Sequence, residues 1–105
     1  MAFLDVYENP HPKSRLAIPF LIDLQADLLA SLATRFVVPL YRADATKVAP
    51  IARLTPTVTF QGQALIAMVP EATGLLAPKL GVPVGRIPGA RGDLVAALDL
   101  LVTGT

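Results

Sequence analysis

The segment Gly89–Thr105 constrains the fold of this chain most, because it has the spacing of one amphipathic helix. It holds no proline, and Leu94, Leu98 and Leu101 recur at i, i+4 and i+7, on one face of an α-helix. Gly104 stands where a helix commonly ends in a left-handed residue. The sequence therefore predicts a C-terminal helix that docks on a sheet through this leucine face.

Two features of the same segment allow a second interpretation. Asp99 interrupts an otherwise apolar run, and the run ends in a short tail, Thr103-Gly104-Thr105. A tail that follows an apolar helix directly stays close to it, so the helix could carry a recognition tip to a partner. The plain alternative is a docked helix whose tail has no role.

The clearest strand signal is the segment Thr57–Val69. Residues alternate on both sides of Gln61-Gly62, as is typical of a β-hairpin with a short turn. The apolar run Thr34–Tyr41 suits a buried strand, and Pro39 within it indicates a sheet edge or a bulge. Further strands are expected at Ala2–Tyr7, at Leu16–Leu24 and at Val84–Ile87.

Two segments are ambiguous. Gln25–Leu32 fits either a helical turn or a strand end that leads into a loop, and Glu71–Leu80 fits one or two helical turns interrupted by Gly74 and Pro78. The tally predicts a mainly β chain with a C-terminal α-helix. Two folds contain these elements: a small β-barrel, or a twisted antiparallel sheet, with the helix packed on it.

Composition indicates one domain, residues 1–105, with more apolar material than a small core absorbs. Hydrophobic residues make up 53% of the chain and charged residues only 16%, compared with about 25% charged in ordinary globular proteins. Another chain should cover part of this apolar surface, so a homodimer is expected.

Several classes of function are excluded or disfavoured by composition. Cysteine is absent, which excludes disulfides, thiol catalysis and zinc–thiolate sites. The net charge is +1 and the nine basic residues are dispersed, so autonomous nucleic-acid binding is disfavoured. Neither a signal peptide nor a membrane span is evident, and a cytoplasmic location is expected.

Catalytic chemistry has little support in the sequence. His11 is the only histidine and stands between two prolines, without a metal-ligand partner at suitable spacing. Asp23 and Asp27 would share one face of a helix, but in a loop one would accept turn amides and the other would be solvated. No glycine-rich phosphate loop is present. Binding through an apolar surface, without metal or cofactor, is the remaining interpretation.

The order of short motifs along nearly the whole chain resembles the CcdB family, the toxin half of a toxin–antitoxin pair. The most specific piece, Asp23 to Leu29, reads DLQADLL and is similar to the family's D-V-Q-S-D-[IL]-[IL]. The other pieces that carry the resemblance are Phe3 with Val6-Tyr7, Ser14-Arg15, Pro19 to Leu21, Thr34 to Leu40, Leu54-x-Pro56, the hairpin and Ala97 to Thr105.

The resemblance implies both a fold and a function. The implied fold is an SH3-like small β-barrel of the CcdB/MazF type with a long C-terminal helix, assembled as a homodimer. The implied function is inhibition of DNA gyrase: the toxin binds the gyrase A subunit and traps the cleaved gyrase–DNA complex. A CcdA-like antitoxin blocks the toxin, and operator DNA is bound only through the antitoxin complex. No cofactor or metal is implied.

The resemblance also implies where the partners bind. Carried over by position, the gyrase contact is built from the tail, the helix face behind it and two leucines nearby: Leu28, Leu29, Asp99, Val102, Thr103, Gly104 and Thr105. Antitoxin contacts are expected at the terminal helix and nearby loops, with Ser14 and Arg15 as candidates. Two helix tips near a two-fold axis would present one self-complementary patch.

One departure from the family pattern keeps alternatives open. The best-known members end in Phe-Trp-Gly-Ile, whereas this chain reads Val102-Thr103-Gly104-Thr105. A toxin-like homodimer that binds an antitoxin but has lost gyrase poisoning is therefore one alternative. Another is an endoribonuclease toxin of the same fold, which would have to use the aspartates near Gln25 together with Arg15, Arg35 and Arg42.

Overall fold

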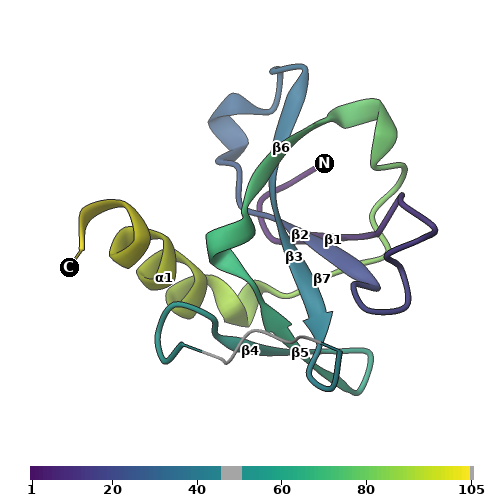
Figure 1. Ribbon diagram of the computed structural model, residues 1–105. Coiled ribbons are helices and arrows are strands. Elements are labelled where there is room, and N and C mark those ends of the chain that lie inside the picture. The colour runs from purple at the N-terminus through teal and green to yellow at the C-terminus, as the bar shows by residue number, and fades with distance from the viewer. Residues whose placement is uncertain (46–50, 105) are drawn as a thin grey trace.

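The computed structural model describes residues 1–45 and 51–104. Within these residues, seven strands and four 3-10 turns precede one α-helix (Figure 1). The elements in chain order are β1 (Asp5–Glu8), β2 (Phe20–Asp23), η1 (Asp27–Leu29), β3 (Thr34–Arg42), β4 (Thr57–Phe60), β5 (Gln63–Ala67), η2 (Val69–Glu71), β6 (Thr73–Leu76), η3 (Ala77–Lys79), β7 (Gly85–Arg86), η4 (Pro88–Ala90) and α1 (Arg91–Thr103). The predicted mainly β fold with a C-terminal helix is confirmed.

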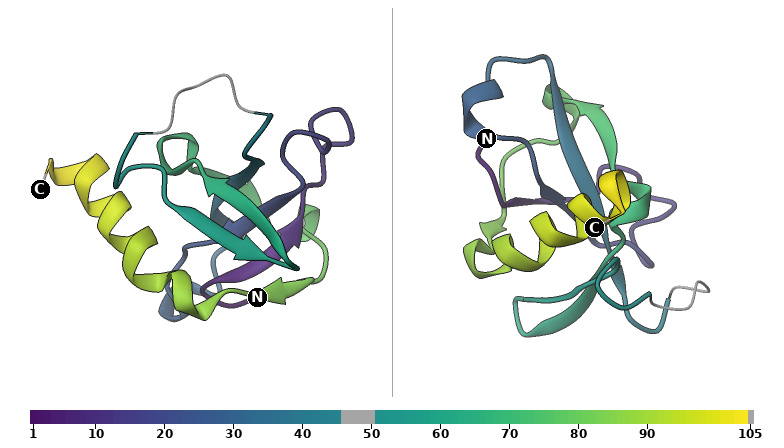
Figure 2. Two further views of the ribbon diagram at one scale, coloured as in Figure 1. Left: turned by 90° about the horizontal axis from the view of Figure 1, so that it is seen from below. Right: turned by 90° about the vertical axis from the view of Figure 1, so that its left-hand side faces the viewer.

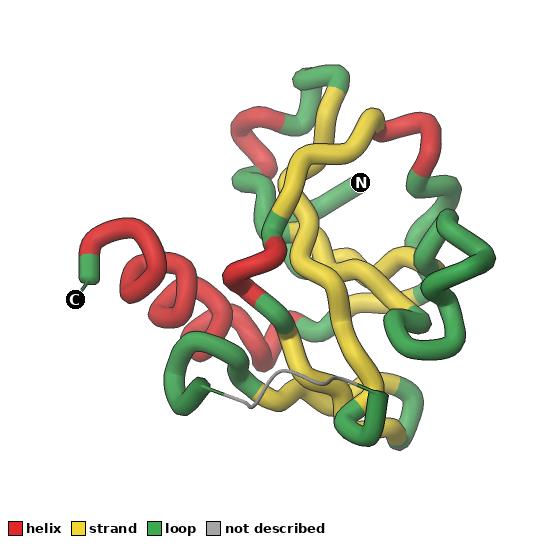
Figure 3. The backbone as a smooth tube through the Cα atoms, viewed as in Figure 1, coloured by secondary structure: helices red, strands yellow, loops and turns green. Residues whose placement is uncertain are grey.

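Strand β3 organises the sheet because it is the longest strand and has neighbours on both sides. All pairings are antiparallel, and the order is β4-β5-β3-β2-β1-β7, with β6 added to the first half of β3. Residues 34–37 pair with β6 and residues 40–42 pair with β5. The sheet therefore divides along β3 and curls into an antiparallel half-barrel, with β6 and the β4–β5 hairpin diverging (Figure 3).

Pro39, which was predicted to mark a sheet edge or a bulge, lies in this dividing region of a central strand, where the ladder on one side of it is interrupted. Pro39 pairs with Leu21 of β2 but belongs to neither the β6 register nor the β5 register. A proline in a central strand is costly because it removes a ladder hydrogen bond. Here the missing N–H falls at the gap between two partner strands, and the Pro39 carbonyl still accepts from the Met68 amide at 3.0 Å.

The predicted hairpin is confirmed, whereas the prediction for the following segment is right only in part, because its helical turn η3 is present but its strand was missed. Gln61 and Gly62 have φ of 52° and 75°, as a two-residue hairpin turn requires. Glu71–Leu80 was expected to hold helical turns, but its centre is strand β6, flanked by η2 and η3. Pairing with β3 determines this strand, since β6 has no alternating pattern of its own.

The helix lies against the curved sheet (Figure 2) and closes the main core. Leu94 and Ala97 are fully buried, and Leu98 packs against the same cluster. Leu101, the last member of the predicted leucine face, is instead 44% exposed. The helix continues beyond the sheet, so its final turn has no apolar surface to cover it.

We expect Gly85→Ala to destabilise the fold. A Cβ at Gly85 would lie 2.6 Å from the Phe60 ring, which itself packs edge-on against Phe20 at a centroid distance of 5.0 Å. Overpacking of this kind costs about 1–3 kcal/mol, measured as the free energy of unfolding in urea. Gly74→Ala is the matched control, because its Cβ would meet no atom within 4 Å. Equal stability of both variants would contradict this packing.

Candidate functional site

The end of α1 is the most prominent apolar projection near the chain's C-terminus. The helix extends beyond the sheet on the left of Figure 1. Val102 is 73% exposed and Leu101 is 44% exposed, on a helix whose earlier turns bury Leu94 and Ala97. Exposed apolar side chains on a rigid helix end cost little entropy to bind, which suits contact with a protein partner.

The residues around the helix end are held in a defined conformation. Gly104 is left-handed, with φ of 77°, and its amide donates to the Leu100 carbonyl at 2.9 Å. This confirms the predicted helix stop. The Thr103 hydroxyl donates to the Asp99 carbonyl at 2.7 Å, which turns this side chain back along the helix. Asp99 is exposed, and Thr105 lies outside the described residues.

The two predicted leucines lie on η1, which resolves the ambiguity of that segment as a single 3-10 turn. Leu28 is 91% exposed and Leu29 is 46% exposed. None of the residues of η1 is buried. An isolated leucine at the surface is ordinary, but two adjacent ones on a protruding turn indicate a contact surface.

The structure does not bring η1 and the tail together within one chain. Asp27 of η1 and Arg91, the first residue of α1, line the same hollow of about 290 Å³. Leu28, which adjoins Asp27, therefore lies near the first residue of α1. The tail follows the last residue of α1, at the opposite end of the helix. A 13-residue helix is about 20 Å long. One partner must either span the helix or contact both ends separately.

Ser14 and Arg15 lie in the loop between β1 and β2, on the side of the sheet away from the C-terminus (Figure 1). Asn9 organises this loop through two hydrogen bonds. Its side-chain amide donates to the Ser14 hydroxyl at 3.0 Å, and its backbone carbonyl accepts from Arg15 Nε at 2.9 Å. Arg15 also approaches Glu8 at 3.4 Å. These two candidate antitoxin contacts are thus remote from the end of α1, although the terminal helix itself was also an expected contact.

A buried ion pair, Asp23–Arg35, lies beneath the start of η1. Both side chains are 0% exposed, and Asp23 Oδ2 lies 2.7 Å from Nε and from Nη2 of Arg35. Asp23 Oδ1 accepts from the Gln25 amide at 2.8 Å. Burial raises the pKa of the Asp23 carboxyl, while the Gln25 amide and the Arg35 guanidinium act against this shift by stabilising the carboxylate.

Tyr7 completes this cluster from β1. Its hydroxyl donates to Asp23 Oδ2 at 3.4 Å, and burial followed by the nearby Asp23 charge raises the pKa of Tyr7 to about 12. Tyr7 therefore remains a donor at neutral pH. The expectation that one of the two aspartates accepts a turn amide is met by Asp23, but the burial of Asp23 with Arg35 was missed. Asp27 is exposed and accepts from the Phe3 amide.

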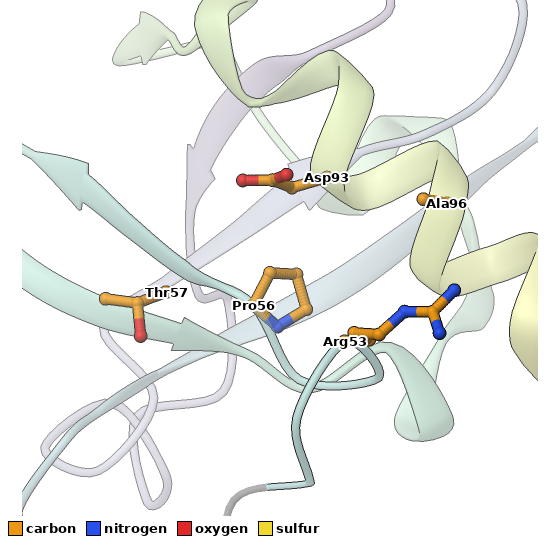
Figure 4. A pocket seen from close by; sticks show the side chains of 5 residues that line it. All are labelled: Arg53, Pro56, Thr57, Asp93 and Ala96. Carbon is orange, nitrogen blue, oxygen red and sulfur yellow. The ribbon is translucent and has the colours of Figure 1, made fainter.

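A hollow of about 350 Å³ lies between α1 and the segment that leads into β4 (Figure 4). Asp93 and Ala96 line it from α1, and Arg53, Pro56 and Thr57 line it from the opposite segment. Among the described residues, no hydrogen bond joins the Thr57 hydroxyl to the Asp93 carboxylate in this hollow. Within residues 1–45 and 51–104, no group of three or more His, Cys, Asp or Glu side chains could hold a metal. No helix in the same residues is long and apolar enough to cross a membrane.

The model of the CcdB protein family matches residues 3–104. The chain belongs to the CcdB family. A search of curated proteins found no match. CcdB proteins are toxins of CcdA–CcdB toxin–antitoxin systems, and they poison DNA gyrase without acting as enzymes. The match covers the motif Asp23–Leu29, the β4–β5 hairpin and α1.

The structure argues against the endoribonuclease alternative, in agreement with membership of the CcdB family. That alternative required Arg15, Arg35 and Arg42 as an RNA-binding set, but Arg35 is fully buried against Asp23. The other two are near carboxylates, Arg15 near Glu8 and Arg42 near Asp44 at 3.6 Å. An RNA groove needs accessible cations that are not already neutralised.

Proposed function

We propose that this CcdB-family chain poisons DNA gyrase by binding the gyrase A subunit and trapping the cleaved gyrase–DNA complex. Family membership supports the target, and one observation supports the contact surface. The final turn of α1 leaves Leu101 44% exposed and Val102 73% exposed beyond the sheet. Burial of such side chains against a partner supplies binding energy without any chemical step.

The proposed gyrase contact has two parts. The first is the end of α1 with its tail, namely Asp99, Val102, Thr103, Gly104 and Thr105. The second is the pair Leu28 and Leu29 on η1. Since the two parts lie near opposite ends of α1 in one chain, a homodimer would combine them into a larger surface. The exposed leucines 28, 29, 32, 76 and 101 support such an assembly, because they leave much apolar area uncovered in the isolated chain.

The CcdA-like antitoxin is the second proposed partner. Ser14 and Arg15 are candidate contacts on the loop between β1 and β2, where a small apolar hollow of about 130 Å³ lies beside Ser14 and Leu75. Operator DNA would be bound only through the toxin–antitoxin complex, since the chain carries a net charge of only +1.

A second candidate function has one specific observation in its favour. Thr103 stands where the best-known members carry tryptophan, and its hydroxyl is turned back to the Asp99 carbonyl at 2.7 Å. Loss of an aromatic anchor costs about 2–4 kcal/mol, which is about 30- to 1000-fold in affinity. The alternative is therefore a toxin-like homodimer that binds an antitoxin but no longer poisons gyrase.

A plasmid-cleavage assay decides between the two. Purified gyrase, supercoiled plasmid and ATP are incubated with the chain, then treated with detergent and protease before electrophoresis. We expect linear DNA that depends on the added chain, because trapped covalent complexes release double-strand breaks. No linear DNA at micromolar protein, with an established gyrase poison active in parallel, would overturn gyrase poisoning and favour the alternative.

A further inference from the structure

The turn that carries Leu28 and Leu29 has no hydrophobic anchor of its own. None of the η1 residues is buried, and a hollow of about 290 Å³ lies beside it, between Phe3, Leu24 and Arg91. A single 3-10 turn has few internal hydrogen bonds and does not hold its shape in isolation. Something other than apolar packing must therefore fix the position of the two leucines.

Gln25 supplies this fixation through both ends of its side-chain amide. Its Nε2 donates to the Leu29 carbonyl at 2.7 Å, and its Oε1 accepts from the Phe36 amide at 2.9 Å. Gln25 is only 7% exposed, so neither bond is easily replaced by water. The side chain thus connects the end of η1 to strand β3, which pairs with three other strands of the sheet.

Gln25 is itself held in place, so the connection is not a loose one. Its own amide donates to Asp23 Oδ1 at 2.8 Å, and Asp23 is fixed by the buried pair with Arg35. Two residues later, Asp27 Oδ1 accepts from the Phe3 amide at 2.8 Å and holds the start of η1. Alternate polar residues of the motif therefore each hold one backbone amide.

We propose that Gln25 is a positioning residue that presents Leu28 and Leu29 to the gyrase A subunit in a preformed geometry. This rests on the proposed function, since it assumes that the leucines contact gyrase. Holding an exposed apolar turn in its bound conformation lowers the entropic cost of association. It also explains why a buried glutamine stands three residues before the first of two solvent-exposed leucines.

The first test uses the unmodified chain and needs no partner. Backbone ¹⁵N order parameters of Leu28 and Leu29 should equal those of the sheet, about 0.85. Values below about 0.6 in the wild-type chain, typical of flexible backbone, would overturn the proposal.

Two substitutions test the amide directly. Gln25→Glu keeps an acceptor for the Phe36 amide but removes the donor to the Leu29 carbonyl, and Gln25→Met removes both bonds at similar length. Each variant should lower the order parameters at η1 and weaken binding to purified gyrase A subunit about tenfold, or about 1.4 kcal/mol. The matched control is Val58→Ala in β4, which is 6% exposed and remote from η1. It should lower global stability while leaving both readouts unchanged.

Leu28→Ala separates this inference from the proposed function. If Leu28→Ala weakens gyrase binding and the Gln25 variants do not, the positioning role is wrong. If the Gln25 variants loosen η1 but neither they nor Leu28→Ala change gyrase affinity, the positioning holds and the proposed gyrase contact at η1 is wrong. A loss of affinity in Val58→Ala equal to that of Gln25→Glu would mean that general destabilisation explains the effect, and would overturn the proposal.

Discussion

Val102→Lys is expected to abolish gyrase poisoning while leaving the fold intact. Val102 is 73% exposed, so lysine at this position meets solvent in the free chain. Lysine is a better helix former than valine and is favoured near a helix C-terminus. In a complex with gyrase the same ammonium group would be buried without a partner. Loss of a central contact costs at least about 2 kcal/mol, or about 30-fold in affinity.

The matched control is Val82→Lys. Val82 is 80% exposed and belongs to the segment between η3 and β7. This segment lies on the side of the molecule away from the C-terminus (Figure 1). Both variants should unfold at the wild-type urea concentration and sediment as the wild type does. The plasmid-cleavage assay should then show linear DNA with Val82→Lys only. Undiminished cleavage by Val102→Lys would remove the end of α1 from the gyrase contact.

The parts of the fold that depend on local sequence were predictable. The repeat of Leu94 and Leu98 defines the buried face of α1, and Gln61-Gly62 supplies the positive φ angles of the hairpin turn. Leu101 has the same spacing but is exposed. Periodicity indicates which residues share a face, whereas the point at which the sheet ends beneath that face depends on the whole fold.

The parts that depend on distant pairing were not predictable. Strand β6 forms because Thr34–Val37 of β3 lies beside it, although its own residues indicate helical turns. Pro39 is tolerated in a central strand because β6 and β5 leave a gap opposite it. The local propensity of a segment contains neither fact, because both arise from pairing between strands that lie far apart along the sequence, such as Thr34 with Leu76 and Leu40 with Ala67.

The candidate site, like the fold, was predictable from the sequence only in part. Exposed leucines at Leu28 and Leu29 follow from the motif that resembles the CcdB family, but their separation from the tail by the length of α1 does not. Arg35 was considered as a surface cation, yet it is fully buried. The sequence does contain a signal for this burial, namely an arginine within an apolar strand, twelve residues after an aspartate that could pair with it. Such a residue must be paired if it is buried.

Asp23→Ala is expected to have the largest effect on folding of any substitution considered. It would leave the Arg35 guanidinium fully buried without its counterion. Breaking a buried pair from one side costs about 3–5 kcal/mol, against a total of about 5–15 kcal/mol for a domain of this size. The variant should also lose the acceptors for the Gln25 amide and the Tyr7 hydroxyl. Urea denaturation followed by circular dichroism measures the loss.

The double variant Asp23→Leu with Arg35→Met tests whether the unpaired charge is the cause. Replacing both partners of a buried pair with apolar residues of similar volume is often neutral or stabilising. We therefore expect the double variant to recover most of the stability that Asp23→Ala loses. Some loss should remain, because the Gln25 amide still lacks its acceptor. A double variant no more stable than Asp23→Ala would mean that the carboxylate matters mainly as a hydrogen-bond acceptor.

Glu8→Ala provides the control for ion pairs in general. The Glu8–Arg15 pair has side chains 59% and 43% exposed and a separation of 3.4 Å, and exposed pairs of this kind contribute about 0–1 kcal/mol. Removing Glu8 leaves Arg15 in water, where its charge is solvated, so the free energy of unfolding should change little. A cost for Glu8→Ala as large as that for Asp23→Ala would contradict burial as the source of the effect, because the two pairs differ chiefly in their access to solvent.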